Sequence, residues 1–279
     1  MNPFIIATGA LLALATASHA ADLPSRKTAP APAPAAELVQ KWSGFYAGLT
    51  AGYGWSSNKT DANYGTTGNS LFNSGMSAGI DAGLLPLSIG SSNNGSLTGG
   101  ATIGYNAQYG SAVYGLEADL ASMKRNSSNF STTLAVSPAD LASAIGTKGS
   151  LNWLGTLRGR AGMTFSNLLV YATGGLAIGG AHSSAGGDVT GTIMTVPFSA
   201  TLAGSKSETR YGWALGGGVE YAINRDWSLK TEYLHYDLGK MSYALNGGGS
   251  FLGAATISGA SARTQINGNL VRAGLNYRF

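Results

Sequence analysis

The sequence predicts an all-β protein: an eight-stranded antiparallel up-and-down transmembrane β-barrel with three short periplasmic turns and four long extracellular loops. Three observations lead to this fold class. From Trp42 onward, apolar residues recur at every second position, which is the period of a strand with one apolar and one polar face. The 42 glycines among 279 residues disfavour long helices, because each costs about 1 kcal/mol relative to alanine. Short and long connections alternate along the chain.

The composition excludes several other classes of protein. Cysteine is absent, which excludes disulfide scaffolds, thiolate metal sites and cysteine nucleophiles. Hydrophobic residues make up 44% of the chain, which is enough to bury a large surface and excludes a disordered polar chain. The net charge of +4 is dispersed along the sequence, which favours contact with an anionic lipid surface over nucleic-acid binding.

The N-terminus has the features of an export signal. The apolar run from Phe4 to Ala17 is shorter than the roughly 20 residues that span a bilayer as a helix. Small residues at positions 18 and 20 lead us to expect cleavage between Ala20 and Ala21. Three prolines then favour an extended chain. The predicted parts are a signal peptide (1–20), a Pro/Ala-rich periplasmic tether (21–41) and a barrel (42–279).

The alternation defines each strand in turn. In the first, Phe45 and Tyr53 lie on one face, while Tyr46 and Thr50 lie on the other. The pattern recurs seven more times. The eight predicted strands are 44–57, 97–109, 112–124, 150–165, 168–180, 209–223, 227–239 and 267–279.

The connections alternate in length. Three are brief turns, at residues 110–111, 166–167 and 224–226. Four are long and rich in Gly, Ser, Thr and Asn, roughly at residues 58–96, 125–149, 181–208 and 240–266. Short turns on one side and long loops on the other are typical of a barrel that spans an outer membrane.

Aromatic residues distinguish a membrane barrel from a soluble β-sandwich or lipocalin-like barrel, which would also alternate. On the apolar face they gather near both ends of the strands, which predicts two aromatic girdles around an apolar band. The predicted girdle residues are Phe45, Tyr109, Phe165, Tyr221, Trp227 and Tyr277 near the short turns, and Tyr53, Trp55, Trp153, Tyr211 and Trp213 near the long loops.

The opposite face carries balanced charges, which predict an ion-pair network inside the barrel. Its predicted members are Glu117, Asp119, Arg158, Arg160, Glu220, Lys230, Glu232 and Arg272. Counting from the short turns places Glu117 level with Arg160, Asp119 level with Arg158, and Glu220 level with Lys230. Eight strands leave room only for side chains, which favours a packed lumen over a narrow polar channel. A carboxylate acid/base pair at positions 117 and 119 is a weaker interpretation, because ion-pair networks also bring carboxylates together.

Other chemistry has little support in the sequence. His182 and Ser183 start the third long loop, where a lipid-cleaving barrel enzyme could place a base and a nucleophile. His235 falls on the apolar phase and is expected to be an interfacial side chain. We predict no metal site, because the two histidines beyond the predicted signal peptide, without cysteine, form no recognisable cluster. We also predict no cofactor, because no phosphate-binding loop joins a strand to a helix.

Several segments together resemble the small α-proteobacterial outer-membrane barrels of the porin-family or OmpA-like kind, which include Brucella-type major surface antigens and rhizobial counterparts. The resemblance covers residues 41–279. It rests on KWSGFYAGLTAGYGW (41–55), GTLRGRAG (155–162), YATGGLA (171–177), GWALGGGVEYAI (212–223), SLKTEYLHYDLG (228–239) and LVRAGLNYRF (270–279).

The resemblance implies a barrel that supports envelope integrity and displays surface loops, with pore activity as an alternative. It also implies that Tyr277 and Phe279 form the C-terminal signal read by the outer-membrane assembly machinery. We therefore expect a non-catalytic structural protein whose partners are outer-membrane lipid, lipopolysaccharide and that machinery. A monomer is expected, with an oligomer as the alternative. The rival functions are a narrow diffusion porin and, with less support, a surface lipid hydrolase using His182 or His235.

Overall fold

The computed structural model describes residues 42–56, 59–63, 88–90, 95–123, 130–136, 140–193, 196–250 and 254–279, all within one compact unit, Val39–Phe279. The predicted signal peptide, its Ala20–Ala21 cleavage site and the tether lie outside the described residues. The described residues contain no helix that is long and apolar enough to cross a membrane.

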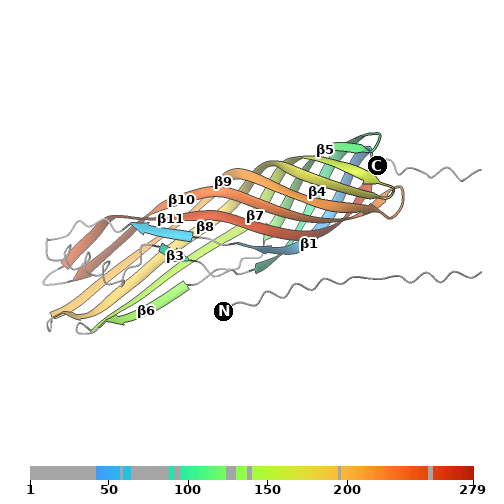
Figure 1. The fold of residues 1–279 in the computed structure, drawn as a ribbon. Coiled ribbons are helices and arrows are strands. Elements are labelled where there is room, and N and C mark those ends of the chain that lie inside the picture. Colours follow the sequence, from blue (N-terminus) through green and yellow to red (C-terminus); the bar gives the residue numbers. More distant parts are fainter. Residues whose placement is uncertain are drawn as a thin grey trace, which may run out of the picture. The chain divides into compact units, whose positions relative to one another are not determined.

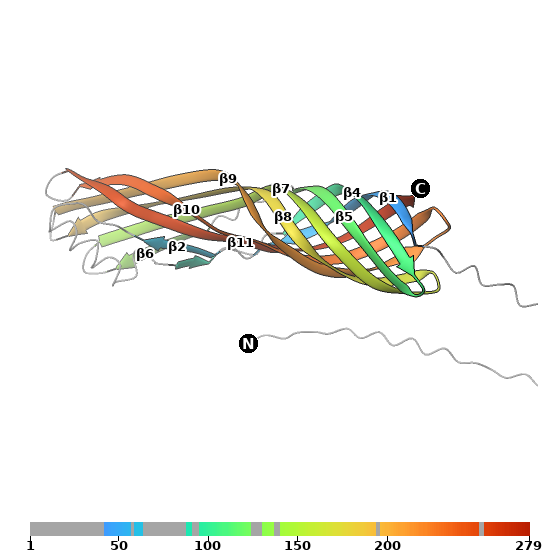
Figure 2. The same cartoon turned by 90° about the horizontal axis from the view of Figure 1, so that it is seen from above.

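Strands of the described residues close into a ring (Figures 1 and 2). Each pairs antiparallel with the next, and the last pairs with the first, from Tyr46↔Arg278 to Trp55↔Asn269. The predicted eight-stranded up-and-down barrel is therefore confirmed. The ring strands are β1 (Gly44–Trp55), β4 (Gly95–Tyr109), β5 (Ala112–Met123), β7 (Asp140–Phe165), β8 (Leu168–Ile193), β9 (Val196–Ala222), β10 (Trp227–Ser250) and β11 (Ala254–Arg278).

Three shorter strands lie outside the ring order. They occupy the stretches predicted as the first two long loops. β2 pairs with the outer part of β11, β3 pairs with β2, and β6 pairs with the outer part of β7. Their bounds are β2 (Lys59–Asn63), β3 (Ser88–Gly90) and β6 (Phe130–Val136).

The last five ring strands are longer than the sequence predicted. Figures 1 and 2 show β7 to β11 continuing past the ends of β1, β4 and β5. Most of the predicted loops 181–208 and 240–266 is therefore strand, paired in the β8–β9 and β10–β11 ladders. These stretches resembled loops because Gly, Ser and Thr dominate them, but their backbone groups still need partners and find them in the ladder.

The two parts of the barrel bury opposite kinds of side chain. Between the short turns and the outer aromatic residues, large apolar side chains such as Leu49 (72% exposed) and Leu176 (68%) face outward. In the strand extensions, Phe198, Leu202 and Leu245 are buried inside, while their neighbours along the strand are exposed or half-buried. The outer face of the extensions is therefore suited to contact with water, whereas the apolar outer face near the short turns is suited to contact with hydrocarbon.

The outward-facing apolar band has the height of a bilayer core. Phe45 and Trp55 lie at opposite ends of the lipid-facing side of β1. Ten residue steps of strand measure roughly 33 Å, or roughly 25 Å along the membrane normal at a tilt of about 40°. This matches the band of a transmembrane barrel, so the outer aromatic residues mark where the chain leaves the hydrocarbon.

Small residues on the inner face make room for large neighbours. Tyr46 of β1 is buried, and its ring lies over Gly104 of β4. A Cβ at Gly104 would overlap the Tyr46 ring and lie 2.7 Å from the carbonyl oxygen of Leu116. A Cβ at Gly99, on the outer face of the same strand, would meet nothing closer than the Thr50 oxygen at 4.0 Å.

We therefore expect Gly104→Ala to lower the free energy of unfolding by about 1–3 kcal/mol, the usual cost of overpacking a closely packed site. Gly99→Ala is the matched control and should not lower it. Urea titration of the folded barrel in detergent, followed by heat-modifiable gel mobility, measures both. Equal stability of the two variants would contradict the close packing of Tyr46 on β4.

Candidate functional site in the lumen

The eight charged residues predicted for the lumen lie together on the inner face. They come from β5, β7, β9, β10 and β11, and each is at most 7% exposed. Four are acids and four are bases, so the set is neutral. The residues are Glu117, Asp119, Arg158, Arg160, Glu220, Lys230, Glu232 and Arg272.

Arg158 occupies the centre of this lumen network. Its Nη2 lies 2.6 Å from Glu117 and 2.7 Å from Asp119, and its Nη1 lies 2.9 Å from Glu232. Its Nε donates to the hydroxyl of Thr156 at 2.9 Å. One guanidinium therefore joins acids from β5 and β10 across the barrel, which suits its rigid fork of donors.

Arg272 of β11 closes the network on the side of the last strand. Its two Nη groups lie 3.0 Å from Asp119 and 2.6 Å from Glu232. Its Nε also donates to Glu232 at 3.0 Å. Because Asp119 and Glu232 already contact Arg158, each carboxylate is shared by two guanidinium groups.

Arg160 and Lys230 complete the network nearer the short turns. Arg160 Nη2 lies 2.8 Å from Glu220, and Lys230 Nζ lies 2.8 Å from Glu117. Two side chains of other strands, Ser228 and Asn276, also donate to Glu220. Each charged group therefore has a counter-charge within 3.0 Å.

Two tyrosines belong to the network although the sequence did not single them out as members. Tyr46 donates its hydroxyl to Glu117 at 2.7 Å, and Tyr171 donates to Glu232 at 2.9 Å. The guanidinium of Arg160 also lies 4.0 Å from the centre of the Tyr171 ring, a cation–π contact. The period of two places both tyrosines on the inner face, and this signal could have identified them.

The predicted register between β5 and β7 was wrong by two residues. The strands pair Glu117 with Arg158 and Asp119 with Thr156, because the strands of a barrel are staggered. Arg158 still reaches Asp119, since its side chain is long. Glu220 and Lys230 are paired in the β9–β10 ladder, as predicted. However, Glu220 forms its ion pair with Arg160, and Lys230 forms its ion pair with Glu117.

Apolar clusters lie above and below the lumen network. Toward the short turns, Trp42 packs with Val113, Leu169 and Tyr171, and Trp42 is fully buried. No sequence pattern indicates that Trp42 turns inward, because this residue precedes the first strand. Toward the extensions lies a second cluster, whose largest fully buried side chains are Leu154, Leu234, Leu238, Met241 and Leu270.

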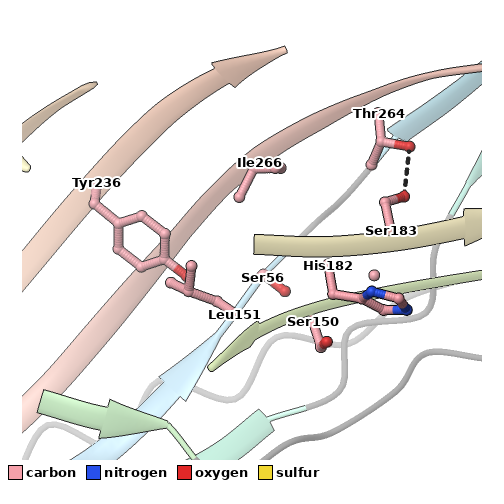
Figure 3. Close-up of a pocket in the computed structure, with 9 residues that line it drawn as sticks. Ser56, Ser150, Leu151, His182, Ser183, Tyr236, Thr264 and Ile266 are labelled. Carbon is pink, nitrogen blue, oxygen red and sulfur yellow. Dashed lines mark hydrogen bonds between the residues drawn. The ribbon is translucent and has the colours of Figure 1, made fainter. Parts of the chain in front are cut away.

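A small polar cavity lies beyond the second cluster (Figure 3). Its volume is about 20 Å³, enough for about one water molecule. Ser183 points toward Thr264, with the two hydroxyl oxygens 3.1 Å apart, and also donates to Tyr243 at 3.3 Å. The cavity is too small for an acyl chain or a sugar.

The histidines are not arranged as the hydrolase hypothesis requires. His182 and Ser183 are neighbours on a strand, so their side chains leave opposite faces, and Ser183 is buried inside. His182 Nδ1 lies 2.7 Å from Ser207 Oγ. His235 faces outward, 5.4 Å from the ring of Trp213 and bonded to Asn269, an interfacial environment. No group of three potential metal-ligating side chains occurs within the described ranges.

The aromatic residues predicted as girdles all lie on the outer face. At the short-turn end, the Tyr277 ring packs 5.1 Å from both Trp227 and Phe279. Phe279, predicted with Tyr277 as an assembly signal, is 80% exposed, and its backbone N–H donates to Phe45. The outward-facing set is Phe45, Tyr53, Trp55, Tyr109, Trp153, Phe165, Tyr211, Trp213, Tyr221, Trp227 and Tyr277.

We expect Glu117→Gln to lower the free energy of unfolding by about 3–5 kcal/mol, because it leaves buried cations without their counter-charge. Glu208→Gln, which removes a carboxylate from an exposed ion pair with Lys206, is the matched control and should leave stability unchanged. Urea titration in detergent measures both. A Glu117→Gln barrel as stable as the control would show that the lumen network does not hold the strands together.

Comparison with known proteins identifies the family. A family model described as the outer membrane protein beta-barrel domain matches residues 8–279. The 31 kDa outer-membrane immunogenic protein of Brucella melitensis is 32% identical over the whole of both chains. A 22 kDa outer membrane protein of Rhizobium leguminosarum is 31% identical over 52% of this chain and 54% of its own. Among solved structures, Neisserial surface protein A covers 85% of this chain and 98% of its own, at 13% identity and a TM-score of 0.32. With its closed ring of strands and a family match that spans nearly the whole chain, this protein belongs to the outer membrane β-barrel family and resides in the outer membrane.

Proposed function

We propose that the protein is a structural barrel that supports the cell envelope and displays its strand extensions outside, with a lumen sealed to ions. The observation that carries the proposal is the filling of the lumen. A neutral set of eight charges occupies its middle, and an apolar cluster lies on each side.

Ion passage would have to disrupt both kinds of layer. An ion that enters the lumen network must displace a counter-charge held within 3.0 Å. It must also cross the cluster of Leu234, Leu238 and Met241, where each side chain is fully buried and offers no polar group. Desolvating a charge among such side chains costs roughly several kcal/mol. The lumen network and the apolar cluster therefore each oppose the passage of an ion.

The outer part of the molecule suits display. The extensions of β8 to β11 have polar outer faces, and relatives of this chain carry the name outer-membrane immunogenic protein. The exposed C-terminal Tyr277 and Phe279 are proposed to contact the outer-membrane assembly machinery. Outer-membrane lipid and lipopolysaccharide are proposed to contact the apolar band and its rims, around a monomeric barrel.

Single-channel recording in planar bilayers tests the sealed lumen. The wild-type barrel should give no stable conductance steps, because both layers block ions. Leu234→Ala, which opens only the apolar layer, should also stay silent because the lumen network remains. Reproducible steps from the wild-type protein would overturn the proposal in favour of a diffusion porin. Heat-modifiable gel mobility of the same preparation shows that the silent protein is folded.

A further inference from the structure

The wall of the barrel has an interruption just outside the aromatic rim. β9 and β10 pair regularly as far as Trp213↔Asp237, and pairing resumes only at Ala203↔Asn246. Between these points β10 also contains a bulge, where Gly239 has a φ of +75° and its N–H donates to the Asp237 carboxylate. Backbone carbonyls of β10 in this gap need donors from elsewhere.

Two basic side chains of β9 supply those donors. Arg210 donates through Nη2 to the carbonyl of Lys240 at 2.8 Å and through Nε to the carbonyl of Leu238 at 3.5 Å. Lys206 donates to the carbonyl of Ser242 at 3.4 Å. Two basic side chains therefore fill the gap, and Glu208 between them forms an ion pair with each.

The outer face next to the gap forms a square of four polar side chains. The β10–β11 ladder pairs Lys240 with Gln265 and Ser242 with Arg263. Lys240, Ser242 and Arg263 are exposed, and Lys240 and Arg263 stand on the diagonal, with backbones roughly 7–8 Å apart. Arg263 uses only its Nε, toward Ser242 at 3.3 Å. Among the described residues, nothing bonds to its Nη groups or to the Lys240 ammonium, so these donors are available.

Charges around the square leave it positive. Across the gap, β9 carries Lys206, Glu208 and Arg210 on the same phase as its inward-facing residues Leu202 and Ala214. The outward-facing charges near the square come from β2, β10 and β11: the cations are Lys59, Lys240 and Arg263, and the anions are Asp61 and Asp237. The Lys206 hydrogen bond, followed by that from Arg210, holds the pKa of Glu208 below its usual range, so this carboxylate is ionised and already paired. Asp237 accepts from Gly239 and Gln265. Asp61 of β2 stands opposite Arg263 in the β11–β2 ladder, but no ion pair joins the two side chains among the described residues. The outward-facing set therefore has one positive charge in excess, and the group of Lys206, Glu208 and Arg210 across the gap adds a second.

The square stands at the height of lipid headgroups. His235 and Trp213, whose rings lie 5.4 Å apart, mark the outer end of the apolar band on β9 and β10. Lys240 lies five positions beyond His235 along the tilted and bulged strand. This places it roughly 10 Å above the hydrocarbon. Phosphate groups of membrane lipids lie in this zone, and basic side chains at such a position are attracted to them.

We propose that Lys240 and Arg263, supported by Ser242 and Gln265, bind the phosphate group of an outer-leaflet lipid headgroup. The inference rests on the proposed structural role, and it names the lipid partner of that role. The ammonium and the free guanidinium nitrogens donate to the phosphate oxygens, Ser242 and Gln265 add neutral donors, and Lys206 and Arg210 supply positive potential from across the gap.

Native mass spectrometry of the full mature barrel in detergent tests the site, at fixed ionic strength. The probes are bisphosphorylated lipid A and its dephosphorylated form. We expect wild type to retain the phosphorylated lipid at lower concentration. Lys240→Gln with Arg263→Gln should raise the apparent Kd about 25-fold, at roughly fivefold per cation. The control pair Lys148→Gln with Arg225→Gln removes the same charge from exposed positions elsewhere on the barrel and should change the Kd little.

Three results would overturn the proposal. The first is equal retention of both lipid forms, and the second is an equal loss in the control pair, which would show general charge attraction. The third is displacement of lipid A by an equal concentration of inorganic phosphate, which would make free phosphate the ligand. Conductance of the same wild-type preparation distinguishes failure of this proposal from failure of the sealed lumen. A barrel that conducts ions but still binds the phosphorylated lipid more tightly contradicts the sealed lumen and leaves the lipid site intact.

Discussion

Each of the eight ionised groups in the lumen network has its counter-charge on another strand, because side chains fill an eight-stranded barrel and leave little room for water. Arg158 of β7 meets Glu117 on β5 and Glu232 on β10, and Arg272 of β11 meets Asp119 on β5. The contacts of β7 with β10 and of β11 with β5 cross the lumen, so they form only when the ring is closed. Buried pairs contribute little net stability compared with apolar packing, but an unpaired member is costly, so the lumen network penalises every arrangement in which one strand is missing or out of register.

Along the longer strands, the large apolar side chains change from the outer face to the inner face of the barrel. Near the short turns it exposes Leu49 and Leu176 and buries ions, whereas farther along it buries Phe198 and Leu245 and exposes polar residues. A single period of two serves both parts, and only the identity of the residues on each phase changes. The point of reversal is set by the outer aromatic residues and is followed at once by the gap between β9 and β10. Basic side chains occupy that gap, where the surrounding medium changes from hydrocarbon to headgroups.

The sequence alone predicted those parts of the strands in which apolar residues and polar or charged residues alternate clearly between the two faces. The short-turn ends of the strands were predicted to within a residue or two, since large apolar and aromatic side chains alternate there with glycine and charge. The extensions were predicted as loops because Gly, Ser and Thr weaken the alternation. Inner-phase charges identified the lumen network, but its partners depend on stagger, which no single strand encodes. The inward position of Trp42 and the contacts of Arg210 depend on how the closed ring packs, and local patterns do not specify that.

The pairing of β1 with β11 has a consequence for how the molecule forms. Tyr46 and Arg278 are partners although almost the entire folded sequence separates them. Contacts between residues so far apart in the sequence slow folding, because the entropy of closing the intervening chain is lost before the contact contributes any stabilisation. The ring closes only when β11, which carries Arg272, pairs with β1. Until that pairing forms, the sheet has two open edges and an apolar outer face, so the exported polypeptide is most vulnerable to aggregation before the ring closes.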